Sequence, residues 1–219
     1  MLQGVLFDMD GLMFDTERIG RDGWHKAAET LRIDLPEELI AAMRGTGTDR
    51  CREIFNAAIP GNLYDAAHEL RLRYADEVIA ADGVPVKPGL RGLLCWLKSA
   101  GIPAVLATST RREKALAYLQ QADVERYFTA AVFGPEVARP KPAPDIFRAA
   151  AAAIHADSAH CVVLEDSPNG LQAAKAAGCP AIVVPDLTPA PPESEQLWNY
   201  RAKDLHAVQQ ILQKERDKL

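Results

Sequence analysis

Helical and strand-like patterns alternate along most of the chain, and this alternation constrains the fold more than any other feature of the sequence. Short apolar runs predict strands at 2–8, 103–108, 130–133, 161–164 and 181–184. Helical patterns occur at 90–100, 111–122, 145–155, 168–177 and 204–214, and the proline-rich stretch 189–192 predicts an irregular loop. Because parallel strands need helical crossovers, this order predicts an α/β fold with a parallel sheet covered on both faces.

A purely helical stretch interrupts this α/β pattern after its first strand. Between residues 15 and about 82, apolar residues such as Trp24 and Ala27 recur at helical spacing. Prolines and glycines divide the stretch into several short helices, and residues 84–89 are typical of a linker. The sequence therefore predicts two domains: a core formed by residues 1–14 and 88–219, and an α-helical insert formed by residues 15–87.

The composition narrows the range of partners and compartments. A net charge of −5 and a pI near 5.6 argue against a broad nucleic-acid interface or an anionic-membrane binder. No apolar run approaches the ~20 residues that span a bilayer, and the N-terminal residues lack the pattern of a signal peptide. The four cysteines form no CxxC pair, which is typical of a reducing compartment. We therefore expect a cytoplasmic monomer that binds neither nucleic acid nor membranes.

Two carboxylates follow the first predicted strand. Asp8 and Asp10 come directly after the apolar run 5–7, and residues spaced i, i+2 on an extended backbone point to the same side. Like charges that close need a cation, a proton or a substrate between them. Thr108 and Glu165 lie at or just past two other predicted strand ends. Since ligands of α/β sheets bind at the carboxyl ends of strands, these side chains predict one functional site.

Four segments of the chain resemble, in order and separation, the four motifs of the haloacid dehalogenase superfamily. They are 8–16 (DMDGLMFDT), 106–110 (LATST), 139–145 (RPKPAPD) and 163–170 (VLEDSPNG). The helical insert is similar to the small α-helical cap of the β-phosphoglucomutase-like group. The resemblance implies a Rossmann-like core with an inserted cap, and a Mg²⁺-dependent phosphatase acting on a small phosphomonoester such as a sugar phosphate or similar metabolite.

The same resemblance implies a role for each motif residue. Asp8 would be the nucleophile that forms an aspartyl-phosphate, and Asp10 would protonate the leaving alcohol and then activate water. Lys141 would neutralise Asp8 and the phosphate, while Thr108 and the backbone N–H of Ser109 would hold phosphate oxygens. The metal would be bound by Asp8, Asp10 through its backbone carbonyl, and Asp166, with Glu165 as a further candidate ligand.

Substrate selection is expected in the insert, because the core motifs supply only a generic phosphate site. The candidate substrate-binding residues are Glu17, Arg18, Arg21, Arg44, Thr48 and Arg50.

Some of these residues also have simpler structural interpretations. Asp15 is a favourable N-cap for the first helix of the insert. Ser167 and Pro168 suit the N-cap and first position of a helix. Lys141 could be a solvated charge, and the prolines around it could form a polyproline segment for a partner or could stiffen the loop that presents it.

The chain departs from the mutase that gives the group its name at two cap positions. Gly20 stands where the mutase has a histidine, and Thr48 stands where it has an arginine, although Arg44 or Arg50 could replace the latter. A mutase must protect its phospho-enzyme from water, so the loss of both groups favours a hydrolase.

Other functions remain open at this stage. They are a phosphosugar mutase, a phosphonatase that uses Lys26 as its imine-forming lysine, and a non-catalytic phospho-ligand-binding protein of the same fold. A dehalogenase is disfavoured, because it would lack the equivalent of Asp10.

Overall fold

The computed structural model describes residues 1–187 and 192–215, and the chain divides into two compact units. One unit comprises residues 1–14 and 86–219, and the other comprises residues 15–85. The chain thus re-enters the first unit at residue 86, slightly earlier than the predicted residue 88. Residues 86 and 87 belong to the first unit because Val86 forms an antiparallel bridge with Phe14 and the backbone N–H of Lys87 donates to the carbonyl of Met13 at 2.9 Å.

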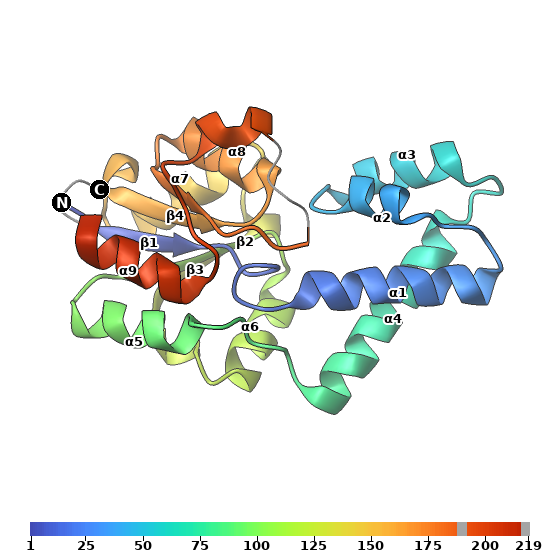
Figure 1. Ribbon diagram of the computed structural model, residues 1–219, viewed down its shortest axis with the longest axis horizontal. Coiled ribbons are helices and arrows are strands. Elements are labelled where there is room, and N and C mark those ends of the chain that lie inside the picture. Colours follow the sequence, from blue (N-terminus) through green and yellow to red (C-terminus); the bar gives the residue numbers. More distant parts are fainter. Residues whose placement is uncertain (188–191, 216–219) are drawn as a thin grey trace. The chain divides into compact units, whose positions relative to one another are not determined.

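The first unit contains a six-stranded parallel sheet, which confirms the predicted α/β fold class (Figure 1). Its strands are β1 (Gly4–Phe7), β2 (Ala104–Thr108), β3 (Phe128–Phe133), β4 (Cys161–Glu165), β5 (Ala181–Val183) and β6 (Tyr200–Arg201). The spatial order is β3-β2-β1-β4-β5-β6. β6 has no counterpart in the sequence prediction, because two residues are too few to show an apolar pattern.

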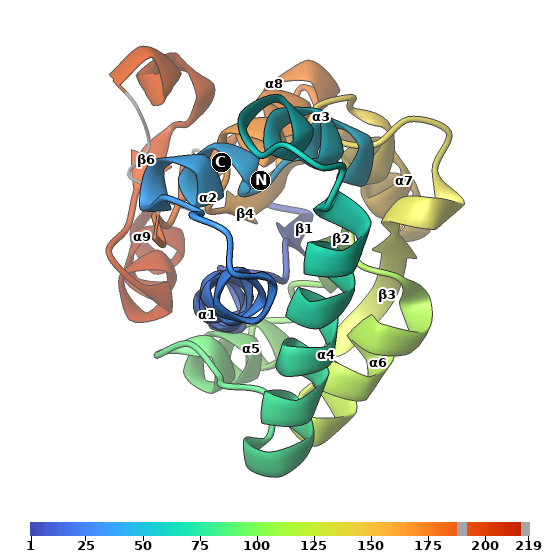
Figure 2. The same cartoon turned by 90° about the vertical axis from the view of Figure 1, so that its right-hand side faces the viewer.

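Helices cover both faces of this sheet, with α7 and α8 on one face and α5, α6 and α9 on the other (Figures 1 and 2). Their bounds are α5 (Leu90–Ser99), α6 (Arg112–Gln121), α7 (Asp145–Ala153), α8 (Pro168–Ala177) and α9 (Leu205–Glu215). Short 3-10 helices occupy Glu125–Tyr127, Gly134–Glu136, Ser158–His160 and Pro192–Leu197, whereas residues 189–191 of the proline-rich stretch lie outside the described residues.

The strand order places the switch point of the topology at β1. From β1 the chain builds outward through β2 and β3, and then crosses back to place β4 on the other side of β1. Phe7 at the end of β1 aligns with Leu106 on β2 and with Leu164 on β4. The carboxyl ends of these three neighbouring strands therefore meet at the position where α/β sheets bind ligands.

The second unit is built from four helices: α1 (Thr16–Leu31), α2 (Glu37–Met43), α3 (Thr48–Ala58) and α4 (Tyr64–Asp82). The rings of Trp24, Phe55 and Tyr64 form the centre of its core, with centroids 5.7–6.2 Å apart. Burial of such large aromatic side chains gives this small unit its own apolar core.

Among the described helices of either unit, none combines the length and the apolar character that crossing a membrane requires.

Candidate active site

The loop after β1 holds Asp8 in a nearly buried position at the carboxyl end of this central strand. Asp8 is only 7% exposed, and its backbone N–H donates to the carbonyl of Leu164 on β4 at 3.1 Å. Gly11 adopts a φ of 79°, which favours glycine, and its N–H donates to the carbonyl of Phe14 at 2.9 Å. Backbone hydrogen bonds therefore hold this turn. The turn follows the end of β1 and carries Asp8 and Asp10.

Lys141 lies between two carboxylates rather than on the solvated surface. Its Nζ donates to Asp8 Oδ1 at 2.5 Å and to Glu165 Oε1 at 2.6 Å, and its side chain is 7% exposed. The ammonium also lies 4.9 Å from the ring centroid of Phe147. The structure thus brings together the third motif with the first and the fourth.

These charges shift one another's pKa values. Burial raises the pKa of Asp8 to about 7, assisted by the nearby charges of Glu165 and Asp10 and opposed by Lys141. Burial alone would lower the pKa of Lys141, but the carboxylates of Asp8 and Glu165 outweigh it and hold that pKa above its ordinary value. One ammonium thus faces several carboxyl groups, so the site favours a further positive charge or a proton.

Glu165 is the fully buried last residue of β4, and its carboxylate organises the turn that follows. Oε2 accepts hydrogen bonds from the backbone N–H of Asp166 at 2.9 Å, the backbone N–H of Ser167 at 2.8 Å and the Ser167 hydroxyl at 2.9 Å. With Lys141 on Oε1, this buried charge is fully compensated.

A divalent cation fits the same corner of the site. Asp8, Glu165 and Asp166 each offer a carboxylate oxygen, and these oxygens lie within 4.8 Å of one another. Carboxylate oxygens are the hard ligands that Mg²⁺ prefers, usually with a few water molecules completing its octahedron. The donor set and the surplus of negative charge are therefore compatible with the predicted Mg²⁺.

The end of β2 contributes three hydroxyl residues, of which the sequence interpretation assigned a role to only two. Thr108 is completely buried, and Ser109 is exposed beside it. Thr110 was missed: its hydroxyl donates to Asp10 Oδ2 at 2.6 Å, and its backbone N–H donates to Thr108 Oγ1 at 3.1 Å. The signal that could have found it is the repeated hydroxyl two residues after Thr108.

Ser167 also confirms the predicted start of a helix. Its hydroxyl accepts from the backbone N–H of Gly170 at 3.1 Å, and Pro168 occupies the first position of α8. Asp15 occupies the N-cap position of α1 but makes no side-chain cap bond, and its Oδ2 instead accepts from Arg18 Nε at 2.9 Å.

Gly170 is required because the carboxylate of Glu165 fills the space beside it. A Cβ added to Gly170 would lie 1.6 Å from Glu165 Oε1. Gly170→Ala should therefore displace Glu165 from its hydrogen bonds and lower the free energy of unfolding by about 1–3 kcal/mol. Chemical denaturation followed by circular dichroism measures this change.

The matched control is Gly92→Ala within helix α5. There the nearest atom to an added Cβ is Gln209 Oε1 at 3.7 Å, an ordinary contact. The control should be neutral or slightly stabilising, because alanine favours helix. Equal unfolding free energies for the two variants would contradict the assigned role of Gly170.

The predicted substrate-binding residues of the insert lie on or near the first three helices, and their arginines pair with carboxylates of the same unit. The N···O distances are 2.9 Å for Arg18–Asp15, 2.9 Å for Arg21–Asp22, 2.9 Å for Arg50–Glu53, 3.7 Å for Arg44–Glu37 and 3.8 Å for Arg44–Glu17. Thr48 is the exposed first residue of α3. The Arg50–Glu53 pair is exposed and contributes little, whereas the Arg44 side chain is only 11% exposed. Substrate selection by these residues stays a prediction.

Gly20, the position that carries histidine in the mutase, is covered by Arg71. Arg71 Nε donates to the carbonyl of Gly20 at 3.3 Å, and its guanidinium carbon lies 5.4 Å from the ring centroid of Trp24. A Cβ at Gly20 would lie 2.6 Å from Arg71 Nη2. A side chain at this position would therefore have to displace the guanidinium.

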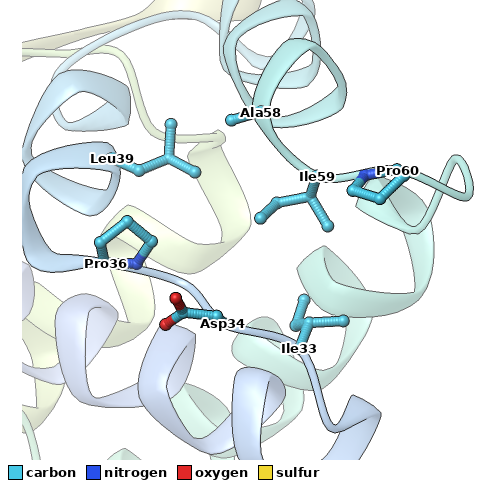
Figure 3. A pocket seen from close by; sticks show the side chains of 7 residues that line it. All are labelled: Ile33, Asp34, Pro36, Leu39, Ala58, Ile59 and Pro60. Carbon is cyan, nitrogen blue, oxygen red and sulfur yellow. The ribbon is translucent and has the colours of Figure 1, made fainter.

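A separate hollow of about 470 Å³ lies within the insert (Figure 3). It is lined by Ile33, Asp34, Pro36, Leu39, Ala58, Ile59 and Pro60. The lining contains none of the predicted site residues, and its mostly apolar side chains do not suit a phosphate ester.

Comparison with known proteins bears on this site. The family model described as haloacid dehalogenase-like hydrolase matches residues 2–178. The phosphorylated carbohydrates phosphatase of Thermotoga maritima is 32% identical over 182 residues, which cover 81% of this chain and 82% of that protein. The β-phosphoglucomutase of Bacillus subtilis is 29% identical over 190 residues, covering 84% and 83% of the two chains.

A solved structure also matches the fold of this chain. The crystal structure of CbbY from Rhodobacter sphaeroides in complex with phosphate has a TM-score of 0.77 and 26% identity. The match covers 95% of this chain and 96% of that one.

Proposed function

The chain belongs to the haloacid dehalogenase-like hydrolases, and we propose that it is a Mg²⁺-dependent phosphatase of small phosphorylated carbohydrates. The observation that carries this proposal is Lys141, held between Asp8 and Glu165 at the switch point of the sheet. An ammonium in that place can offset the repulsion between a carboxylate nucleophile and a phosphate dianion. The named activity of the Thermotoga maritima relative supports a phosphorylated carbohydrate as the substrate.

In the first step, a carboxylate oxygen of Asp8 attacks phosphorus and the bond from phosphorus to the ester oxygen breaks. Asp10 gives its proton to the departing alcohol, so the products are an aspartyl-phosphate on Asp8, a neutral alcohol and the Asp10 carboxylate. Lys141 neutralises charge on Asp8 and on the transferring phosphoryl group.

In the second step, the Asp10 carboxylate takes a proton from water, and the water oxygen attacks phosphorus. The bond to Asp8 breaks, inorganic phosphate leaves, and both aspartates return to their starting states. Thr108 Oγ1 accepts the N–H of Thr110, so its hydroxyl proton is directed elsewhere and can donate to a phosphate oxygen, together with the backbone N–H of Ser109.

Mg²⁺ would be held by Asp8, Asp166 and the backbone carbonyl of Asp10, and when bound it supplies positive charge against the phosphate oxygens. We place Glu165 behind these ligands, because its carboxylate already accepts hydrogen bonds from the turn at Asp166 and Ser167 and from Lys141. In this arrangement Glu165 orients Lys141 and the turn that carries Asp166.

Hydrolysis of a phosphate ester is favoured over the mutase and phosphonatase reactions by two features of the insert. Gly20 has no side chain, and Arg71 fills the space beside it, so no group at this position can act as the mutase histidine does. The pKa of Lys26 is raised by its hydrogen bond to Glu29, whereas an imine-forming lysine of a phosphonatase needs a lowered pKa.

Metal dependence and substrate class provide the test. Purified protein with Mg²⁺ should release inorganic phosphate from sugar phosphates, should lose this activity with EDTA, and should regain it when excess Mg²⁺ is added. A phosphate-release assay over a panel of sugar phosphates measures both properties. Binding of sugar phosphates with no release under any condition would instead favour a non-catalytic phospho-ligand-binding protein, and formation of an isomeric sugar phosphate faster than inorganic phosphate would favour a mutase.

A further inference from the structure

We propose that Thr110 is a positioning residue that orients Asp10 for proton transfer, an inference that rests on the proposed phosphatase function. The Thr110 hydroxyl donates to Asp10 Oδ2 at 2.6 Å. This distance lies in the short range typical of a hydroxyl bonded to a carboxylate, where hydrogen bonds are roughly twice as strong as between neutral groups.

Thr110 is itself fixed to the sheet. Its backbone N–H donates to Oγ1 of Thr108, the completely buried last residue of β2. A threonine hydroxyl that accepts the N–H two residues later closes a tight local turn. Because β2 lies beside β1 in the sheet, this turn stands next to the loop that carries Asp10.

The hydrogen bond limits the rotation of the Asp10 side chain, because the Thr110 hydroxyl holds one of its two carboxyl oxygens. A group that transfers a proton to the leaving oxygen has to be held in one orientation toward it. Thr110 thus acts on the reaction through Asp10.

The test compares Thr110→Val, which removes the hydroxyl at nearly constant shape, with Thr110→Ser, which keeps it. Each protein is assayed with Mg²⁺ on a sugar phosphate that the wild type hydrolyses and on p-nitrophenyl phosphate. A sugar alkoxide needs a proton in order to leave, whereas nitrophenolate is a weak base that leaves without one. The parameter is kcat/KM, because it covers the steps up to departure of the alcohol.

Thr110→Val should lower kcat/KM for the sugar phosphate by about 10–100-fold, part of the contribution of a general acid, and should change the value for p-nitrophenyl phosphate only a few-fold. Thr110→Ser should restore both values. Thr110→Ala lacks the hydroxyl and cannot crowd its neighbours, so it should show the same selectivity if the valine variant folds poorly.

Equal losses on the two esters in the valine and alanine variants would overturn the inference, since a general packing defect or a lost phosphate contact affects both substrates. A serine variant as impaired as valine would also overturn it. Wild-type protein inert toward both esters would overturn the proposed function and this inference with it.

Discussion

Replacing Asp8 by asparagine should remove nearly all phosphatase turnover, by about 10⁴-fold or more, while leaving the fold intact. The amide has almost the shape of the carboxylate but cannot attack phosphorus. Asp8 is nearly buried and burial raises its pKa to about 7, so a neutral side chain at this position is well tolerated. The measurements are turnover of the best sugar phosphate and thermal unfolding of the metal-free protein.

The control for this variant is Asp65→Asn, the same chemical change at an exposed residue of α4 that pairs with Arg52. It should keep wild-type turnover and stability, because exposed ion pairs contribute little. Turnover in the Asp8 variant within about 100-fold of wild type, after subtraction of the rate of a mock purification, would show that another group is the nucleophile.

The positions of the main site residues follow from the sequence for a simple reason. Asp8, Thr108 and Glu165 each end or follow an apolar run, and a parallel sheet brings the ends of such runs to one edge. The helical periodicity around Trp24 likewise indicates the insert. Local pattern and strand topology therefore suffice to predict where these residues lie along the sheet.

What the sequence does not contain is the direction of individual side chains. Glu165 appears in the sequence as a metal-ligand candidate, yet its carboxylate accepts hydrogen bonds from the following turn and from Lys141, which lies 24 residues away in the chain. The bond from Thr110 to Asp10 spans 100 residues. Such contacts depend on rotamers and on packing across neighbouring strands, and neither leaves a periodic pattern.

Replacing Lys141 by methionine should both inactivate and destabilise the protein. Methionine keeps most of the shape of the side chain but leaves Asp8 and Glu165 without the ammonium that contacts both. Breaking a buried ion pair from one side costs about 3–5 kcal/mol of unfolding free energy. Turnover should fall by about 10³-fold or more, because the charge that offsets the phosphate is lost from a water-poor site.

This stability loss should grow as the pH rises. Asp8 has a folded-state pKa of about 7 against an ordinary value of 3.8, so its contribution to stability is present below the ordinary value and is lost as pH rises through the folded pKa. Lys141 is a charge that opposes this rise, so its removal raises the pKa of Asp8 further and steepens the loss.

Denaturation of the metal-free proteins at about pH 5 and about pH 8 measures this pH dependence, and the difference between wild type and Lys141→Met should be larger at the higher pH. Lys26→Met is the matched control, because the exposed Lys26 pairs with Glu29 at the surface of the insert. The control should have little effect on stability at either pH. A stability difference for Lys141→Met that stays constant between the two pH values would mean that Lys141 contributes through packing against Phe147 rather than through its charge. In that case its proposed role in neutralising Asp8 would be wrong.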